Sequence, residues 1–141
     1  MAEHKAEAEW RGGLKDGSGK VRLGSGAFDG PYSFRSRFED GGETNPEELI
    51  GAAHAGCFSM ALAFGLEKAG HKATRIRTTA KVRLEPSGGG FAITAIALEN
   101  EAEVPGIDPG RFQKEAEEAK KNCPVSKALA GTAITLAAKL I

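Results

Sequence analysis

The stretch Thr44-Asn-Pro-Glu-Glu-Leu-Ile-Gly-Ala-Ala-His-Ala-Gly-Cys-Phe-Ser-Met-Ala-Leu62 decides the fold, because it begins the longest helix that the sequence predicts. Asn45 can cap this helix, Pro46 suits its first position, and Glu47 favours the positive end of the helix dipole. Gly70 provides a natural stop. The sequence therefore predicts one long helix in the middle of the chain.

The run from Leu49 to Leu66 contains 18 residues without a formal charge, which just reaches the length of a membrane span. Its three glycines, its many alanines and the polar residues His54 and Ser59 favour burial inside a protein instead. Small residues recur four positions apart, as in Ala52 and Gly56, and this spacing allows close approach of another helix. One chain has few elements with which to surround such a helix, so we expect an intimate homodimer.

Length and charge narrow the classes of function. A chain of 141 residues predicts one domain, spanning residues 1–141. Lys and Arg total 19, as do Asp and Glu, so the zero net charge argues against a nucleic-acid partner and against a polybasic membrane surface. Residues 1–10 lack the apolar core of a secretory signal, which favours a cytoplasmic location in which the two cysteines are thiols.

The remaining elements predict an α+β fold. Alternating patterns predict strands over residues 4–11, 20–23, 32–38, 75–85, 91–104 and 132–141. Asp108-Pro109 opens a charged helix that extends to about Lys121, and Cys123-Pro124 opens a short one. Because the helices do not alternate with the strands, a doubly wound sheet is not expected.

The two cysteines, Cys57 and Cys123, allow more than one interpretation. Cys57 lies in the middle of the apolar helix, where a thiol often acts as a small hydrophobic side chain. Cys123 lies at a predicted helix start with Lys120, Lys121 and Lys127 close in sequence, a setting that favours a reactive thiolate. The pair could also be a peroxidatic thiol and its resolving thiol, provided that their Cα atoms lie within about 7 Å.

His54 lies three residues before Cys57, on the same face of the helix. Such a pair could begin a metal site, but three histidines and two cysteines are few for the four ligands that zinc usually takes. We therefore expect no metal, and we expect His54 to serve in helix packing or in a polar contact near the thiol.

The stretch Thr44–Leu62 resembles the signature of the osmotically inducible protein C (OsmC) family of thiol-dependent hydroperoxide peroxidases. The segments 31–39, 91–98, 104–108 and 122–126 resemble the family as well, so the resemblance covers nearly the whole chain. The key arginine in the predicted strand just before the helix, and His54 three residues before Cys57, favour the osmotically inducible branch over the organic hydroperoxide resistance branch. The resemblance implies an intertwined homodimer with active sites at its interface.

The resemblance also implies roles for four residues. Cys57 corresponds to the peroxidatic cysteine, Cys123 to the resolving cysteine, Arg37 to the arginine that stabilises the thiolate, and Glu47 to the glutamate that holds this arginine. Local electrostatics favour Cys123 as the reactive thiol, whereas the family assigns attack to Cys57. We follow the family, because an arginine can supply Cys57 with the missing cation. Without the resemblance, Arg35 and Arg37 could not be told apart.

Helix geometry adds a prediction about the dimer. Glu47 and Cys57 are ten residues apart, or about 15 Å along a continuous helix, which one arginine does not comfortably bridge. If two central helices cross antiparallel about a dyad, Glu47 of one chain can approach Cys57 of the other. We therefore expect each active site to mix residues from both chains.

The sequence thus predicts a two-cysteine peroxidase that reduces organic hydroperoxides to alcohols and protects against oxidative or osmotic stress. Its partners would be a hydroperoxide substrate and an external dithiol reductant, which the resemblance implies to be of the lipoyl type, and it would need no bound cofactor. The alternative is a redox sensor or small-ligand binding protein that uses the same cysteine pair without turnover. A metal-binding protein is a third hypothesis.

Overall fold

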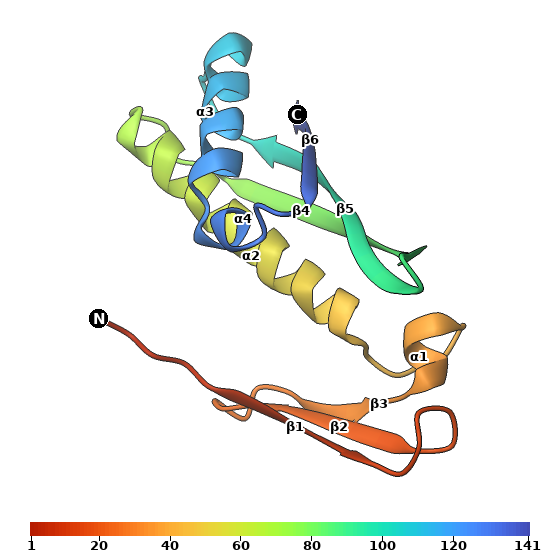
Figure 1. Ribbon diagram of the computed structural model, residues 1–141. Helices are drawn as coiled ribbons and strands as arrows, with labels where there is room; N and C mark the ends of the chain where they lie inside the picture. The colour runs from red at the N-terminus through yellow and green to blue at the C-terminus, as the bar shows by residue number, and fades with distance from the viewer. The chain divides into compact units, whose positions relative to one another are not determined.

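The computed structural model describes residues 1–141, which form two compact units (Figure 1). The N-terminal unit comprises residues 1–49 and the C-terminal unit residues 50–141. The expectation of a single domain over residues 1–141 stays a prediction. The α+β class is confirmed, since strands, a long helix, strands, helices and a final strand follow one another along the chain.

The N-terminal unit is built on a three-stranded antiparallel sheet in the order β1-β2-β3. The strands are β1 (Ala6–Arg11), β2 (Ser18–Leu23) and β3 (Asp29–Tyr32). The rings of Trp10 and Tyr32 pack across the sheet with their centroids 5.4 Å apart. Gly19 lies between their strands, and a Cβ atom there would come within 2.5 Å of both rings. This close packing requires glycine at position 19.

The strand predicted over residues 32–38 is wrong, because β3 ends at Tyr32 and residues Phe34–Phe38 form the short helix α1. A capping box starts this helix: the Ser36 backbone N–H donates to Ser33 Oγ, and the Ser33 backbone N–H donates to Ser36 Oγ. The spacing of four between Phe34 and Phe38 fits both a strand and a helix. In the structure this spacing packs their tilted rings together on one helix face, with centroids 4.9 Å apart.

The C-terminal unit pairs helices with a second three-stranded sheet in the order β4-β5-β6. The long helix α2 (Pro46–Lys68) leads into β4 (Arg75–Ser87), which pairs antiparallel with β5 (Gly90–Glu103). Next come α3 (Pro109–Asn122), α4 (Pro124–Ala128) and β6 (Ala133–Leu140), and β6 pairs parallel with β5. The chain turns between β4 and β5 at Gly88 and Gly89, which adopt positive φ angles.

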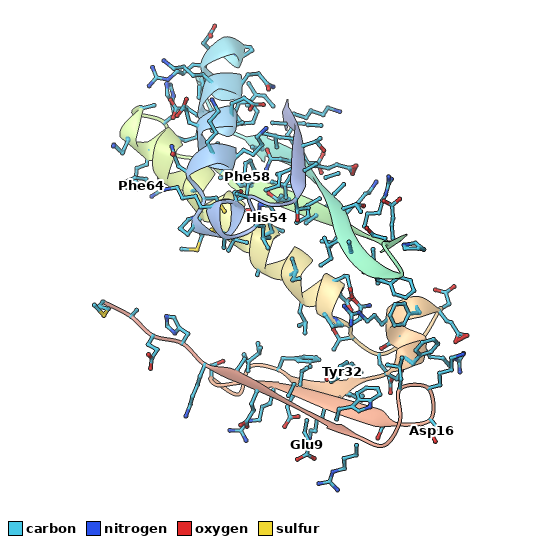
Figure 2. The ribbon with its side chains drawn as sticks, viewed as in Figure 1. Glu9, Asp16, Tyr32, His54, Phe58 and Phe64 are labelled. Atoms are coloured by element: carbon cyan, nitrogen blue, oxygen red, sulfur yellow. The ribbon has the colours of Figure 1, made fainter.

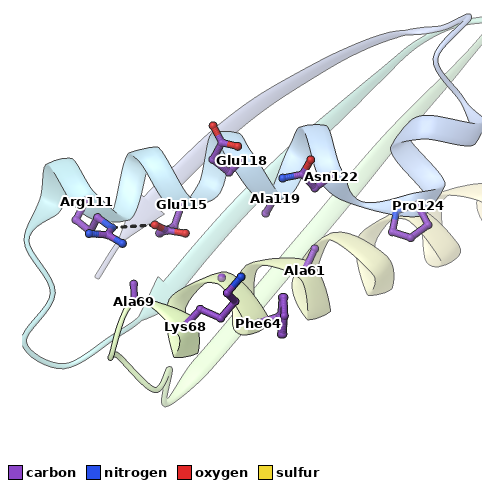
Figure 3. Close-up of a pocket in the computed structure, with 11 residues that line it drawn as sticks. Ala61, Phe64, Lys68, Ala69, Arg111, Glu115, Glu118, Ala119, Asn122 and Pro124 are labelled. Atoms are coloured by element: carbon purple, nitrogen blue, oxygen red, sulfur yellow. Dashed lines mark hydrogen bonds and ion pairs between the residues drawn. The ribbon is translucent and has the colours of Figure 1, made fainter.

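The core of this unit lies between the sheet and the two longer helices. It joins side chains of α2, β5 and α3, among which Phe58, Ile96 and Phe112 are fully buried. In Figure 3, α2 and α3 run side by side in front of the strands. One face of α2 therefore packs against the sheet and α3.

The opposite face of α2 is exposed in the single chain. Met60 and Phe64 are 76% and 65% exposed, and the small residues Ala52, Ala53 and Gly56 are exposed as well. By length and composition α2 could also cross a membrane, with a mean hydropathy of 1.6 in a window that is 28% buried. One chain therefore does not surround α2, as its few elements led us to expect, and the second apolar face of the helix lies open.

Candidate active site

The two cysteines meet in the C-terminal unit. Cys57 lies in the middle of α2 and is partly buried, whereas Cys123 joins α3 to α4 and is fully buried. Their Sγ atoms are 2.7 Å apart, although 66 positions separate them in the sequence. Both are thiols, and they lie close enough to form a disulfide bond with only small movements.

Local backbone structure explains the position of Cys123. This residue is the C-cap of α3 and the N-cap of α4, and Pro124 occupies the first position of α4, as the sequence predicts. The Cys123 backbone N–H donates to the carbonyl oxygen of Ala119 over 2.9 Å, and the Cys123 carbonyl oxygen accepts from Lys127. The chain therefore turns at Cys123 with its thiol directed toward α2.

The surroundings of Cys57 disfavour its thiolate. Burial raises the pKa of the Cys57 thiol above its ordinary value, and the contact with Cys123 raises this pKa further. A hydrogen bond from the backbone N–H of Val125, in α4, acts in the opposite direction. The raised pKa lowers the fraction of thiolate at neutral pH, and a nearby cation would favour the thiolate.

Arg37 and Glu47 meet in the N-terminal unit. Arg37 Nε, on α1, donates to Glu47 Oε1, in the first turn of α2, over 2.9 Å. The Glu47 side chain is only 8% exposed, whereas that of Arg37 is 40% exposed. The second carboxylate oxygen of Glu47 is buried without a hydrogen-bond partner. The structure thus joins the two residues that the resemblance pairs, and it leaves Arg35 exposed.

Two hydrogen bonds hold α1 against the start of α2 and so position Arg37. Ser36 Oγ donates to the carbonyl oxygen of Thr44 over 2.7 Å, and Asn45 Nδ2 donates to the carbonyl oxygen of Ser36. Asn45 also caps α2 as predicted, since its Oδ1 accepts from the Glu48 backbone N–H. The corrected helix α1 is therefore the element that brings Arg37 to Glu47.

An apolar pocket of about 220 Å³ lies beside Arg37 in the N-terminal unit. Aromatic and aliphatic side chains line most of it: Trp10, Leu14, Tyr32, Phe34 and Phe38. Figure 2 shows Tyr32 on this unit. Sequence reasoning missed the pocket, although the concentration of aromatic residues within residues 32–38 was a signal of it. An arginine at the rim of an apolar pocket suits a molecule with one polar and one apolar end.

His54 forms the polar contact that the sequence left open. Its Nε2 lies 2.8 Å from Ser126 Oγ, and both side chains are buried. Its Nδ1 has no hydrogen-bond partner, and burial lowers the pKa of the imidazole below its ordinary value. No group of three or more His, Cys, Asp or Glu side chains is placed to hold a metal ion. Sequence reasoning missed Ser126, although it follows Cys123 by three residues just as His54 precedes Cys57 by three.

A larger hollow of about 580 Å³ lies between α2 and α3 (Figure 3). Phe64 and Lys68 line its α2 side, and an ion pair between Arg111 and Glu115, 2.8 Å long, lies on its α3 side. Neither cysteine lines this hollow. The thiol pair and the Arg37–Glu47 pair are therefore the candidates for reactive groups.

Comparisons with known proteins point to one family. The family model described as OsmC-like protein matches residues 39–139, more than half of the chain, and Arg37 lies two residues before this match. Peroxiredoxin OsmC of Escherichia coli (strain K12) is 52% identical over 126 residues, which cover 89% of this chain and 88% of that protein. Peroxiredoxin OsmC of Shigella flexneri matches with the same values.

Solved structures agree with this match. An organic hydroperoxide resistance protein from Elizabethkingia anophelis is 26% identical with a TM-score of 0.72, over 99% of this chain and 96% of that chain. An organic hydroperoxide resistance protein OsmC from Legionella pneumophila is 24% identical with a TM-score of 0.75, over 99% of each chain, and supports the fold alone. The family match and the 52% identity show that this chain belongs to the OsmC family.

Proposed function

We propose that this protein is a two-cysteine thiol peroxidase that reduces organic hydroperoxides to alcohols. The observation that carries the proposal is the 2.7 Å separation of the Cys57 and Cys123 sulfur atoms. The 52% identity to a protein named Peroxiredoxin OsmC supports it, as does the 26% identity to an organic hydroperoxide resistance protein. We further propose that the protein acts in the cytoplasm and protects against oxidative and osmotic stress.

Cys57 makes the first attack. Cys57 is partly exposed whereas Cys123 is fully buried, so a hydroperoxide reaches Cys57 first. The Cys57 thiolate attacks the distal peroxide oxygen, the O–O bond breaks, and the alkoxide takes a proton to leave as the alcohol. Cys57 is then a sulfenic acid. The neighbouring sulfur of Cys123 is placed to resolve it.

Cys123 makes the second attack. Its thiol sulfur attacks the Cys57 sulfur, the S–O bond breaks, and the released hydroxide takes the thiol proton to leave as water. The product is a Cys57–Cys123 disulfide, formed without any further oxidant. An external dithiol then exchanges with this disulfide, which restores both thiols and oxidises the reductant. We propose a lipoyl-type dithiol as this partner, and no metal or prosthetic group takes part in these steps.

Arg37 supplies the cation that Cys57 lacks. Burial raises the pKa of the Cys57 thiol, and an arginine within hydrogen-bond reach favours the thiolate and the negative charge that develops on the leaving oxygen. Glu47 holds Arg37 by the Nε–Oε1 bond, which leaves the two Nη groups available to an anion. Because Glu47 lies about 15 Å along α2 from Cys57, we propose that Arg37 and Glu47 of one chain serve Cys57 of the other.

A homodimer makes this arrangement possible. The exposed face of α2 carries Met60 and Phe64 beside exposed small residues, a surface typical of a buried helix contact. Covering it with α2 of a second copy removes this apolar surface from water and brings two central helices together. The active sites would then lie at the dimer interface.

The apolar pocket beside Arg37 favours organic hydroperoxides over hydrogen peroxide. An alkyl or aryl group would occupy the space lined by Trp10 and Tyr32 while the peroxide lies at the guanidinium. Comparison of turnover with cumene hydroperoxide and with hydrogen peroxide tests this preference. A higher kcat/KM for cumene hydroperoxide is expected, and a clear preference for hydrogen peroxide would refute it.

Substitution of each cysteine tests the function itself. With reduced lipoyl dithiol as reductant, a small amount of wild-type protein should consume many equivalents of cumene hydroperoxide. Cys57→Ser should lose the first fast step, whereas Cys123→Ser should keep it and stop at the sulfenic acid. Disulfide formation without turnover would instead indicate a redox sensor.

A further inference from the structure

The contact between His54 and Ser126 has no part in the proposed reaction, yet it lies beside the reacting sulfurs. It joins α2 to α4 over 2.8 Å, across 72 positions of sequence. His54 precedes Cys57 by one helical turn, and Ser126 follows Cys123 by three residues. Figure 2 shows His54 on α2 where α4 lies against that helix. The same two elements are therefore joined at two neighbouring points, one between sulfurs and one between His54 and Ser126.

Two further polar contacts link the start of α4 to α2, and both end on the Cys57 sulfur. The Cys123 sulfur lies against the Cys57 sulfur, and the Val125 backbone N–H donates to that same sulfur. The Cys57 sulfur gains an oxygen when the sulfenic acid forms, so both contacts change during the reaction. The Cys123 backbone N–H is bound to Ala119 of α3, which does not tie it to α2.

The helix α4 has little local stabilisation of its first turn. It has only five residues, Pro124–Ala128, and Cys123 makes no side-chain capping hydrogen bond. Ser126 is its buried residue, 6% exposed, and it faces His54, which is fully buried. The bond between them contains no sulfur, so none of its atoms takes part in the reaction.

We propose that the His54–Ser126 hydrogen bond is a clamp that keeps Cys123 against Cys57 through the catalytic cycle, so that the sulfenic acid is resolved before a second hydroperoxide oxidises it further. His54 and Ser126 are positioning residues, because they act through the placement of Cys123 and form no bond in the proposed reaction. The inference rests on the proposed peroxidase function. Without the clamp, Cys123 would leave Cys57 more often, and the sulfenic acid would persist long enough to become a sulfinic acid.

The burial of the His54 imidazole supports a positioning role for this residue. The imidazole is fully buried and its Nδ1 has no hydrogen-bond partner, which costs folding free energy that an apolar side chain used only for packing would not cost. Burial also lowers the pKa of His54, so the imidazole is neutral at neutral pH, where Ser126 Oγ can pair with Nε2 as either donor or acceptor. A neutral pair of this kind adds no charge beside the Cys57 thiol.

Ser126→Ala tests the clamp, with Ser59→Ala as its matched control. Ser59 Oγ also makes a side-chain hydrogen bond from α2, 2.7 Å long, but its partner is Thr78 Oγ1 on β4. Single-turnover measurements with cumene hydroperoxide separate oxidation of Cys57 from disulfide formation. In Ser126→Ala we expect oxidation within about twofold of wild type and disulfide formation slowed about tenfold or more. Ser59→Ala should leave both rates near wild type, and Ser126→Thr should restore fast disulfide formation.

Intact-mass analysis provides the second readout. At rising hydroperoxide concentrations, Ser126→Ala should accumulate the sulfinic acid at lower concentrations than wild type or Ser59→Ala. Should Ser126→Ala fail to fold, His54→Phe breaks the same bond from the other side while keeping a ring at position 54. Disulfide formation at the wild-type rate in a folded variant that lacks the bond would overturn the clamp.

A redox titration separates failure of the clamp from failure of the peroxidase. Equilibration with mixtures of oxidised and reduced dithiothreitol measures how strongly the two thiols favour their disulfide, without any hydroperoxide. Ser126→Ala should require about fivefold or more of the oxidised reagent, relative to wild type, to reach half-oxidation. Equal midpoints would overturn the clamp, whereas a wild-type protein that titrates normally but does not react with hydroperoxide would overturn only the proposed function.

Discussion

Arg37 Nε lies 2.9 Å from Glu47 Oε1, so a carboxylate that is only 8% exposed holds a guanidinium that is 40% exposed. A buried acid gains its partner from the short helix α1, and the guanidinium keeps its Nη groups for another anion. We propose that this pair presents a positive charge to the Cys57 thiolate.

Replacing Arg37 should shift the reaction of Cys57 to higher pH. Burial raises the pKa of the Cys57 thiol, and Arg37→Ala removes the cation that we propose offsets this effect. At neutral pH the rate of Cys57 oxidation should fall about tenfold or more, and it should recover as the pH rises and the thiolate forms. Stopped-flow oxidation rates across a pH series measure this. Arg35→Ala, an exposed arginine on the same helix, should keep the wild-type profile, and an unshifted profile in Arg37→Ala would contradict the role of Arg37.

Mixed dimers should show whether each site draws on two chains. Neither Arg37→Ala nor Cys57→Ser homodimers have a complete site. In a mixed dimer, Cys57 of the first chain would meet Arg37 of the second. An equimolar mixture that has been unfolded and refolded together should regain about a quarter of the wild-type activity, since about half of the dimers are mixed and each has one complete site. No recovery in mixtures that contain mixed dimers would place Arg37 and Cys57 of one site in a single chain.

The sequence predicts the elements of the C-terminal unit well, because its patterns are long. The uncharged run of α2 and the alternation in β4 extend over many residues, and both elements occur as expected. The hydrophobic pattern gives the wrong structure for residues 32–38, because the spacing of Phe34 and Phe38 fits both a strand and a helix. The decisive interaction is the capping box between Ser33 and Ser36, which is too short a pattern to outweigh the alternation.

The site was predictable in part. The motifs identify Cys57 and Cys123, but only the folded chain brings sulfurs 66 positions apart to 2.7 Å. The partner of His54 was not predictable, since Ser126 lies 72 positions away and no local pattern links the two. The dimer that the apolar helix predicts stays a prediction, and the exposed face with Met60 and Phe64 is the surface that it would cover.

Loss of the Ser36 hydroxyl should destabilise the N-terminal unit. This hydroxyl accepts from the Ser33 backbone N–H and donates to the Thr44 carbonyl oxygen, so Ser36→Ala removes a hydrogen bond from each of two partly buried backbone groups. The free energy of unfolding should fall by about 1–3 kcal/mol. Urea denaturation measures this loss. Ser25→Ala, in an exposed turn of the same unit, should cost less, and equal costs in both variants would contradict the account of α1.

Stability should fall in mildly acidic solution because of His54. Burial lowers the pKa of this imidazole in the folded chain, whereas in the unfolded chain it takes up a proton at its ordinary value of 6.5. Above that pH both states are neutral and the contribution of His54 is complete. Below it the unfolded state binds more protons, so the free energy of unfolding falls by at most about 1.4 kcal/mol per pH unit from this residue. Urea denaturation between about pH 8 and about pH 5 measures the slope.

Two variants test whether His54 causes this pH dependence of the free energy of unfolding. His54→Phe has no titrating group at the buried position, so its free energy of unfolding should depend less on pH over the same range. His4→Gln removes an exposed histidine and should keep the wild-type slope. An unchanged slope in His54→Phe would show that other groups cause the acid sensitivity.

The most direct test of the account is the chemical fate of the two cysteines after one equivalent of cumene hydroperoxide. Peptide mapping of the reduced wild-type protein, treated and then alkylated, identifies each cysteine product. We predict one disulfide between Cys57 and Cys123 within each chain, and in Cys123→Ser a sulfenic acid on Cys57 instead. A sulfenic acid on Cys123 in the Cys57→Ser variant, formed as fast as the wild-type disulfide, would contradict the assignment of Cys57 as the attacking thiol.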